Sequence, residues 1–403
     1  MPASLKLGIA GLGTVGACVA RLIERQHDAL AARCGRAIEV VAVTARSRSK
    51  KRDIGHSKLR WVVDPVTLAT DGEIDVFVEL IGGEGDPART AVSAALAAKK
   101  SVVTANKALL ARHGIALAAI AEKNHVALNF EAAVGGAIPI VKTLREGLAG
   151  NSLARIYGIL NGTCNYILTR MEEEKLAFAE CLKEAQRLGY AEADPTFDIE
   201  GHDTAQKLAI LASLAFGTKV DQGAVYVEGI SSIASEDLEW ADELGYRVKL
   251  LGVAVKTDKG IEQRVHPTMV PKETAIAQVM GVTNAVTVDV DAIAPITLVG
   301  PGAGGLATAS AVVSDIGDIA RGVRTAPFGR PSARLTTSKK APMQRHRGEP
   351  PHGGEVAGSS GEPVPVILIT YATTEDAVRK ALAAVSRDKV ILGKPQVIRI
   401  EKN

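Results

Sequence analysis

The feature that most restricts the fold is a glycine-rich turn near the N-terminus. Residues 5–10 form a short apolar run, residues 11–16 read Gly-Leu-Gly-Thr-Val-Gly, and residues 17–24 have a helical pattern. Alone, such a turn is a weak signal, but between a strand and a helix it is the dinucleotide-binding arrangement. Its glycines permit a tight turn, close approach to a pyrophosphate and close helix–strand packing. A plain strand–turn–helix crossover is the alternative. The predicted cofactor contacts are Gly11, Gly13, Thr14, Val15 and Gly16.

Strands and helices continue to alternate after this turn. Alternation of this kind predicts a parallel, doubly wound sheet with its ligand at the carboxyl ends of the strands. We therefore predict an α/β fold with a Rossmann-type domain over residues 1–130. The predicted strands are 38–43, 75–80, 101–104 and 126–130, and Ala-rich helices are predicted near 87–98 and 111–123.

A basic segment follows the second predicted strand, where dinucleotide-binding domains distinguish their cofactors. Residues 46–52 contain five basic side chains, and no acidic residue ends the strand. An Asp or Glu there would hold the ribose 2′-hydroxyl of NAD, whereas arginine accommodates the 2′-phosphate of NADP. We predict a preference for NADP(H) over NAD(H), with Arg46 at the phosphate. A solvated loop and a nucleic-acid patch are the alternatives.

Composition gives no support for a macromolecular partner. The 48 basic and 45 acidic side chains nearly balance, so we expect no nucleic-acid and no membrane partner. The chain also lacks a charged leader and any run of the ~18 apolar residues that a membrane span needs. We expect a cytoplasmic protein whose four scattered cysteines are reduced and buried.

The middle of the chain has an acidic segment that leads into a predicted helix. Glu192, Asp198 and Asp203 lie in this segment, and the helix is predicted from Gly201 to Gly217. Lys207 continues the apolar stripe of the helix, with Asp203 four residues earlier on the same face. Such pairs are most often solvated ion pairs, but a lysine on a face that should be buried is rare unless paired or functional. The residues alone leave both interpretations open.

A divalent metal ion is a competing interpretation of the acidic segment, because hard cations bind carboxylate oxygens. The spacing fits no EF-hand loop, and no histidine pair accompanies it. We therefore favour a site without a divalent catalytic metal. Around this segment, strands predicted at 154–160, 249–255, 262–267 and 285–290 mix with helices, which indicates an α+β domain over residues 131–300.

Together, these segments resemble homoserine dehydrogenase from residue 5 to about 325. The resemblance implies reversible reduction of L-aspartate 4-semialdehyde to L-homoserine with NAD(P)H, in threonine and methionine biosynthesis. A nucleotide-binding regulator without catalysis, or a dehydrogenase for another small semialdehyde, is the alternative. The matching segments are Gly11–Gly16, Thr104–Lys107, Glu131–Pro139, Asn161–Tyr166, Gly189–Lys207 and Gly300–Gly305.

The resemblance also implies roles for particular residues. Lys207 would protonate the aldehyde oxygen as hydride arrives, with Lys107 as a second acid candidate. Asp203 would bind substrate, and the carboxylates available for its ammonium group are Glu192, Asp198 and Asp203. Thr104, Lys107, Gly189 and Gly302 would lie along the cofactor. Backbone carbonyls at Glu131, Val134, Gly136 and Ile138 would hold a monovalent cation, usually Na⁺.

The C-terminal region departs from the family pattern. A helix near 306–321 should complete the Rossmann-type domain, which would then include residues 300–325. Residues 338–363 are rich in Pro and Gly and predict a disordered linker. In residues 364–403 we predict a strand at 364–370, a helix at 374–386 and a strand at 396–400. This unit resembles the second half of an ACT regulatory domain, and the first half is missing. We therefore expect no strong inhibition by threonine. The family resemblance also implies a homodimer or homotetramer built through the sheet of the middle domain.

Overall fold

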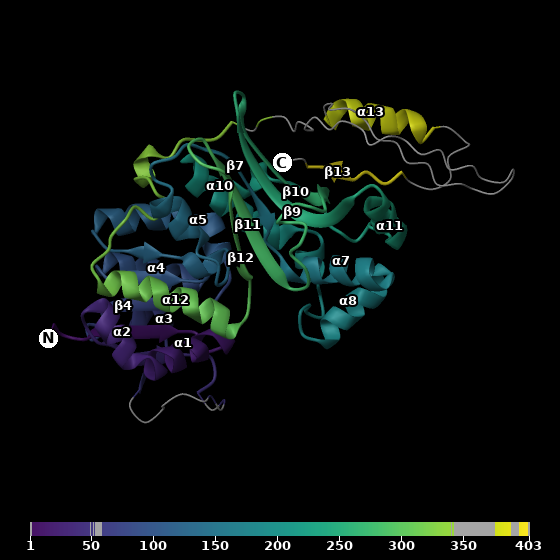
Figure 1. Cartoon of the computed structure of the whole chain (residues 1–403). Helices are drawn as coiled ribbons and strands as arrows, with labels where there is room; N and C mark the ends of the chain where they lie inside the picture. The colour runs from purple at the N-terminus through teal and green to yellow at the C-terminus, as the bar shows by residue number, and fades with distance from the viewer. Residues whose placement is uncertain are drawn as a thin grey trace, which may run out of the picture.

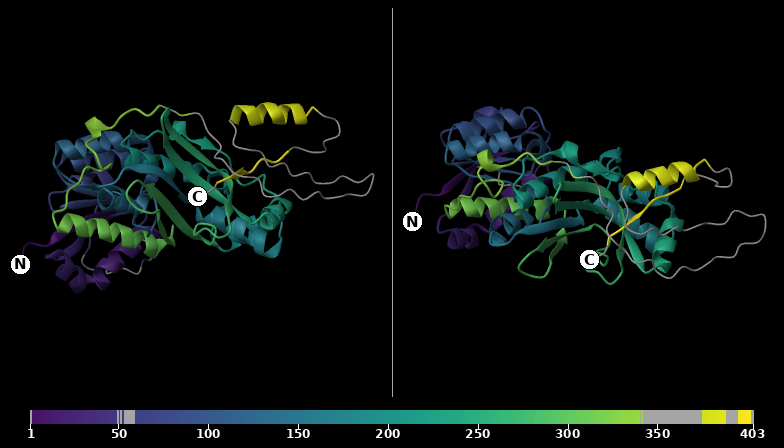
Figure 2. Two further views of the ribbon diagram at one scale, coloured as in Figure 1. Left: turned by 45° about the horizontal axis from the view of Figure 1, so that its top comes forward. Right: turned by 90° about the horizontal axis from the view of Figure 1, so that it is seen from above.

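The computed structural model describes residues 2–48, 50, 52, 59–339, 341, 375–387 and 395–401. Two sheets organise it, and Figures 1 and 2 show them side by side. The first is a six-stranded sheet in which every pair is parallel, in the order β3-β2-β1-β4-β5-β6. This is the usual strand order of a dinucleotide-binding domain. Its strands are β1 (Leu5–Ala10), β2 (Ile38–Thr44), β3 (Arg60–Trp61), β4 (Val76–Glu79), β5 (Ser101–Thr104) and β6 (Leu128–Asn129).

Helices cover both faces of this sheet. On one face α12, which follows the mixed sheet in the sequence, packs against α1, beside α2 (Figure 1). On the other face α3, α4 and α5 pack in a row. The alternation of β1 explains the two layers, because Leu7 and Ile9 belong to one apolar cluster and Ala10 to the other. The helices are α1 (Thr14–Arg25), α2 (His27–Cys34), α3 (Pro65–Ala69), α4 (Ala88–Ala97), α5 (Lys107–Lys123) and α12 (Gly305–Ala320).

The second sheet is mixed, with the order β12-β11-β7-β9-β10-β13 and β8 also paired with β10. The pairs among β7, β9, β10, β11 and β12 are antiparallel, whereas β8 and β13 run parallel to β10. The predicted α+β domain is therefore present. Its strands are β7 (Leu153–Ile159), β8 (Tyr226–Val227), β9 (Tyr246–Thr257), β10 (Gly260–Pro271), β11 (Thr283–Val290), β12 (Ile296–Pro301) and β13 (Arg399–Ile400).

The helix α10 (His202–Phe216) joins the two halves. It packs on β7, β9 and β10 of the mixed sheet and on α5 of the dinucleotide-binding domain, and nearly all of its side chains are buried. A glycine in the left-handed conformation lies at each end of α10, Gly201 at φ +82° and Gly217 at φ +68°. These are the two helix ends that the sequence predicted. The other helical segments are η2 (Glu131–Ala133), α6 (Ile140–Lys142), η3 (Thr143–Gly147), α7 (Gly162–Glu174), α8 (Phe178–Arg187), α9 (Thr196–Ile199), η4 (Gln222–Ala224), α11 (Ser235–Glu243), η5 (Ser332–Arg334) and α13 (Glu375–Val385).

The C-terminal region is described only in part. The strand predicted at 364–370 and almost all of the predicted linker at 338–363 lie outside the described residues. The helix predicted at 374–386 is α13, and the strand predicted at 396–400 is β13. This strand joins the edge of the mixed sheet, beside β10, which the sequence pattern did not indicate.

Candidate active site

Two lysines from different domains converge on one buried carboxylate. Asp203 is the second residue of α10 and is 5% exposed. Its Oδ2 lies 2.7 Å from Lys207 Nζ, one helical turn further on, and its Oδ1 lies 3.3 Å from Lys107 Nζ. Lys107 is the first residue of α5, at the carboxyl end of the parallel sheet. The structure therefore brings together all three residues that were predicted to be catalytic.

The ammonium group of Lys207 is tightly held. Besides Asp203, it donates to the carbonyl oxygen of Leu160 at 2.7 Å. The Lys207 side chain is 12% exposed, whereas that of Lys107 is 34% exposed. An ammonium has three N–H donors, and these two acceptors leave the third available to a substrate oxygen.

The charges around Asp203 keep it ionised. Burial alone would raise its pKa, but the positive charges of Lys207 and Lys107, with hydrogen bonds from Lys207 and Asn161, hold the pKa at about 2. Asp198 differs, because burial and the charge of Asp203 raise its pKa above the ordinary value. The two neighbouring carboxylates thus have opposite shifts.

Asn161 connects these two carboxylates, and the sequence analysis assigned it no role. Its Oδ1 accepts from the Cys164 N–H at 2.8 Å and caps α7. Its Nδ2 is then directed at the acids and donates to Asp198 Oδ1 and Asp203 Oδ2, both at 2.9 Å. The signal for it in the sequence was the polar Asn-Gly-Thr-Cys-Asn run after a predicted strand.

Other acidic residues of the segment lie apart from this cluster. Glu192 is exposed, and among the described contacts only its backbone oxygen is engaged, by Gln186 Nε2 at 3.1 Å. Asp194 accepts the Thr196 N–H at 3.1 Å, and the carboxylate of Glu200 accepts from the hydroxyl of Ser231. A substrate contact by Glu192 therefore remains a prediction, and Asp194 and Glu200 have local structural partners.

The glycine turn has the geometry that a dinucleotide requires. Gly11 has φ +99°, and a Cβ there would lie 2.3 Å from the carbonyl oxygen of Leu80, just after the end of the neighbouring strand β4. A Cβ at Gly16 would lie 1.9 Å from the oxygen of Gly11, so the turn and α1 can pack only with glycine. Gly13 has open space around its missing side chain, which leaves the backbone accessible. Thr14 begins α1, whose N-terminus faces this turn.

The basic segment is attached to the same turn. Arg52 Nε donates to the carbonyl oxygen of Leu12 at 2.7 Å, and the Cζ atoms of Arg48 and Arg52 lie 5.6 and 5.9 Å from the ring centre of Trp61. Arg46, the predicted phosphate contact, is exposed beyond the end of β2. The sequence analysis missed Arg52, because the link depends on how the loop folds back.

Thr104 ends β5 and lies inside the protein. Its hydroxyl donates to Glu79 Oε2 at 2.5 Å and accepts the Asn106 N–H at 3.0 Å. The side chain of Asn106 caps α5, which starts four residues earlier than predicted and so places Lys107 in its first turn. The hydroxyl of Thr104 thus orders this loop, and a cofactor would meet the loop backbone.

The predicted cation segment packs against the loop that contains Gly302. Gly136 has φ +59°, and a Cβ there would lie 2.4 Å from the carbonyl carbon of Gly302. The carboxylate of Glu131 accepts the N–H groups of Val141 and Lys142 at 2.8 and 2.9 Å. It therefore stabilises the start of α6, which leaves backbone carbonyls as the donors for an ion. Val134 and Ile138 lie in the same buried segment.

Among the described residues, no group of three His, Cys, Asp or Glu side chains is arranged to hold a metal ion, and no described helix is long and apolar enough to cross a membrane.

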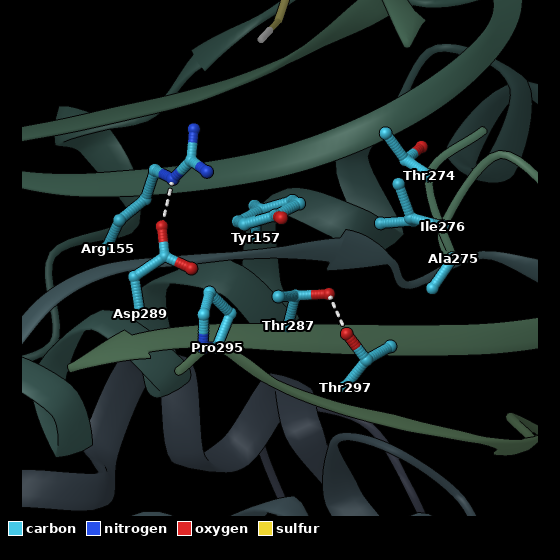
Figure 3. Close-up of a pocket in the computed structure, with 9 residues that line it drawn as sticks. All are labelled: Arg155, Tyr157, Thr274, Ala275, Ile276, Thr287, Asp289, Pro295 and Thr297. Atoms are coloured by element: carbon cyan, nitrogen blue, oxygen red, sulfur yellow. Dashed lines mark hydrogen bonds and ion pairs between the residues drawn. The ribbon is translucent and has the colours of Figure 1, made fainter. Parts of the chain in front are cut away.

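Figure 3 shows a pocket on the mixed sheet with an Arg155–Asp289 ion pair, which shares no residue with the Asp203 cluster. Its lining residues are Arg155, Tyr157, Thr274, Ala275, Ile276, Thr287, Asp289, Pro295 and Thr297.

The fold and the lysine cluster together define a class of protein. A dinucleotide at the glycine turn would extend across the carboxyl ends of the strands towards Lys107 and the domain boundary. There, two ammonium groups can stabilise and protonate an oxygen that gains negative charge. The class is a two-domain dehydrogenase that uses a nicotinamide nucleotide.

Comparison with known proteins identifies the family. A family model described as homoserine dehydrogenase matches residues 139–316, and one described as homoserine dehydrogenase, NAD binding domain, matches residues 11–131. The chain belongs to the homoserine dehydrogenase family. It is an oxidoreductase that interconverts L-aspartate 4-semialdehyde and L-homoserine with a nicotinamide nucleotide.

Individual relatives agree with this assignment. Homoserine dehydrogenase of Neisseria gonorrhoeae is 51% identical over 317 residues, which cover 79% of this chain and 72% of the relative. The crystal structure of homoserine dehydrogenase from Thiobacillus denitrificans has a TM-score of 0.90 and 42% identity, covering 99% of this chain and 98% of that chain. A hyperthermophilic archaeal homoserine dehydrogenase in complex with NADPH has a TM-score of 0.67 and 27% identity, covering 78% of this chain and 97% of that chain.

Proposed function

We propose that Lys207 is the proton donor and that Asp203 orients it while binding the substrate. The observation that carries the proposal is the Asp203 cluster, in which one carboxylate holds Lys207 at 2.7 Å and Lys107 at 3.3 Å. Hydride transfer to the aldehyde places negative charge on its oxygen, and the third N–H of Lys207 stabilises that charge and supplies the proton. Lys107, which is more exposed, contributes positive charge beside the cofactor.

The pH dependence of two alanine variants tests this assignment. Loss of the true donor should remove the basic-side ionisation from the kcat profile, because no group then needs to remain protonated. We expect this for Lys207→Ala, whereas Lys107→Ala should lower the rate and keep the basic limb. The opposite result would make Lys107 the donor.

The amino-acid part of the substrate needs groups of both signs. Its ammonium group requires a carboxylate, and Asp203, Asp198 and Glu192 are the candidates in the acidic segment. Asp203 and Asp198 share the amide of Asn161, which holds them as a pair. We assign the substrate ammonium to this pair, with exposed Glu192 of the 189–195 turn closing over it. Gly189, at φ +78° in that turn, and Gly302 would lie beside the nicotinamide.

For the cofactor we propose a preference for NADP(H) over NAD(H). Exposed Arg46 follows β2, Arg52 holds the basic segment on the glycine turn, and the archaeal relative was solved with NADPH. Arg46→Asp should lower the ratio of NADPH to NADH efficiency about tenfold, because one charged phosphate contact is lost. Arg33→Asp, an exposed arginine on α2, is the matched control. An unchanged ratio for Arg46→Asp contradicts the proposal.

We also propose a monovalent cation, probed as Na⁺, on the carbonyls of Glu131, Val134, Gly136 and Ile138. Its role would be to fix this segment against the Gly302 loop. Thermal unfolding in sodium chloride and in choline chloride at equal ionic strength tests it, and equal midpoints would argue against the site.

From the family resemblance we further propose a cytoplasmic homodimer or homotetramer, to be checked by light scattering of the purified protein.

A further inference from the structure

Buried charge holds the C-terminal strand on the mixed sheet. β13 pairs with β10 through Thr268–Arg399 and Met269–Ile400, and the N–H of Glu401 donates to the Met269 oxygen at 3.0 Å. The carboxylate of Glu401 forms an ion pair with the guanidinium of Arg264, whose side chain is 3% exposed. In Figure 1 the strand runs beside β10. Both backbone and side-chain contacts therefore anchor β13 and the adjoining Glu401.

From this strand Arg399 reaches across to β8. Its guanidinium binds both carboxylate oxygens of Glu228, with Nη2 3.0 Å from Oε1, and its Cζ lies 5.4 Å from the ring centre of Tyr226. The Arg399 side chain is 6% exposed and that of Glu228 is 35% exposed, so the ion pair is buried on the arginine side and meets solvent on the glutamate side. Gln396 Nε2 donates to the hydroxyl of Ser232 at 3.3 Å, which is a second contact with the segment that follows β8 and contains Glu228.

The segment that Arg399 holds packs against the turn before α10. Gly229 has no room for a side chain, because a Cβ would lie 2.4 Å from the oxygen of Ile199 and 2.6 Å from Cα of Glu200. The N–H of Ile230 donates to the Ile199 oxygen at 2.8 Å, and the Ser231 hydroxyl donates to Glu200 Oε1 at 2.7 Å. This turn lies between the two carboxylates that share the amide of Asn161.

We propose that Arg399 is a positioning residue for the two carboxylates, Asp198 and Asp203, that are proposed to bind the substrate. By holding Glu228, it keeps residues 228–231 against the turn at 199–201 and so fixes the separation of Asp198 and Asp203. Each link from Arg399 to the 199–201 turn is a contact between packed groups, which is the physical form that coupling between distant sites takes. The inference rests on the proposed function, because it assumes that Asp198 and Asp203 bind the substrate.

Kinetics of Arg399→Gln provide the first test. Loosening the turn should raise KM for the amino-acid substrate by about 2- to 30-fold, the range that corresponds to coupling through such networks. KM for the cofactor should stay unchanged, because the glycine turn lies in the other domain. Glu228→Gln should have a similar effect, and the double variant should match a single variant rather than their product. Arg387→Gln, an exposed arginine just after α13, is the control.

Hydrogen exchange of the holoenzyme separates the possible failures. In Arg399→Gln, exchange should increase over residues 196–204 and stay unchanged over residues 5–16. Unchanged exchange at 196–204 overturns the inference. Increased exchange with an unchanged substrate KM would support the positioning of the 199–201 turn by Arg399. It would overturn the assignment of substrate binding to Asp198 and Asp203. If the Gln variant does not fold, Arg399→Lys is used instead, because it keeps the positive charge. It should give a substrate KM and an exchange rate above those of wild type. Wild-type values for both would overturn the inference.

Discussion

Lys207 and Lys249 both lie among apolar residues of the substrate domain, yet they meet different partners. Lys207 on α10 contacts the ionised carboxylate of Asp203 at 2.7 Å. Lys249 on β9 is 1% exposed, and its ammonium group donates to neutral acceptors, Asn165 Oδ1 at 3.0 Å and the Val279 oxygen at 2.7 Å. Burial lowers the pKa of Lys249 to about 8, against a smaller opposing effect of Glu172. Apolar surroundings are therefore common to both lysines, and the charge of the partner is what distinguishes Lys207, the proposed proton donor.

The largest expected effect comes from making the partner of Lys207 neutral, as the partners of Lys249 are. In Asp203→Asn, both lysines lose their shared charge and repel each other, which should lower kcat/KM about a thousandfold. Steady-state oxidation of NADPH with the semialdehyde measures this. Asp194→Asn changes an exposed carboxylate of the same segment and should stay within about twofold of wild type. An Asp203→Asn enzyme with near-normal efficiency would show that this carboxylate does not organise the site.

The comparison also shows what could be predicted from the sequence. The glycine turn, the parallel sheet and both ends of α10 follow from local rules, because glycine conformation and residue periodicity act over a few residues. The position of Asp203 beside Lys207 also follows from helical spacing, because the two lie four residues apart on α10. Only the fold brings Lys107 to this pair and Asn165 to Lys249. The pairing of β13 with β10 has no local signal either, because it joins residues far apart in the sequence through two-residue contacts.

The stability of the protein should depend on pH through Lys249. Its folded-state pKa of about 8 lies below the ordinary 10.5, so the unfolded chain binds more protons between these values. The free energy of unfolding therefore rises between pH 8 and 10.5, because the buried amine loses the proton whose charge is costly to bury. This gain is complete above pH 10.5 and is lost as the pH falls through 8. Relative to Lys249→Met, the wild type should gain about 3 kcal/mol of unfolding free energy from pH 7.5 to 10.5. Denaturant titrations at several pH values measure it, and parallel curves for the two proteins would contradict the low pKa.

Asn161 tests whether the carboxylate pair needs its amide. Asn161→Ala removes the hydrogen bonds to Asp198 and Asp203. We expect the reaction to lose the equivalent of one hydrogen bond to a charged group, about 1.5–3 kcal/mol, so kcat/KM should fall about 10- to 100-fold. The lost hydrogen bond normally lowers the pKa of Asp198, so the acid limb of the profile should also move to higher pH. Asn124→Ala, at the C-terminal end of α5, is the control. A reduced rate with an unmoved acid limb would mean that Asn161 serves only to cap α7.

The smallest expected effect completes the contrast between the two lysines. Lys249→Met leaves the Val279 oxygen bonded by Asn165 Nδ2 at 3.1 Å, and the apolar replacement removes a costly buried charge. The activity should therefore stay within about twofold of wild type at neutral pH, although Lys249 is more deeply buried than Lys207. The same assay that detects a thousandfold loss in Asp203→Asn is sensitive enough to measure this difference. A loss of activity in Lys249→Met as large as that of Lys207→Ala would mean that a buried lysine with neutral partners can also control the reaction, and that partner charge is not what sets Lys207 apart.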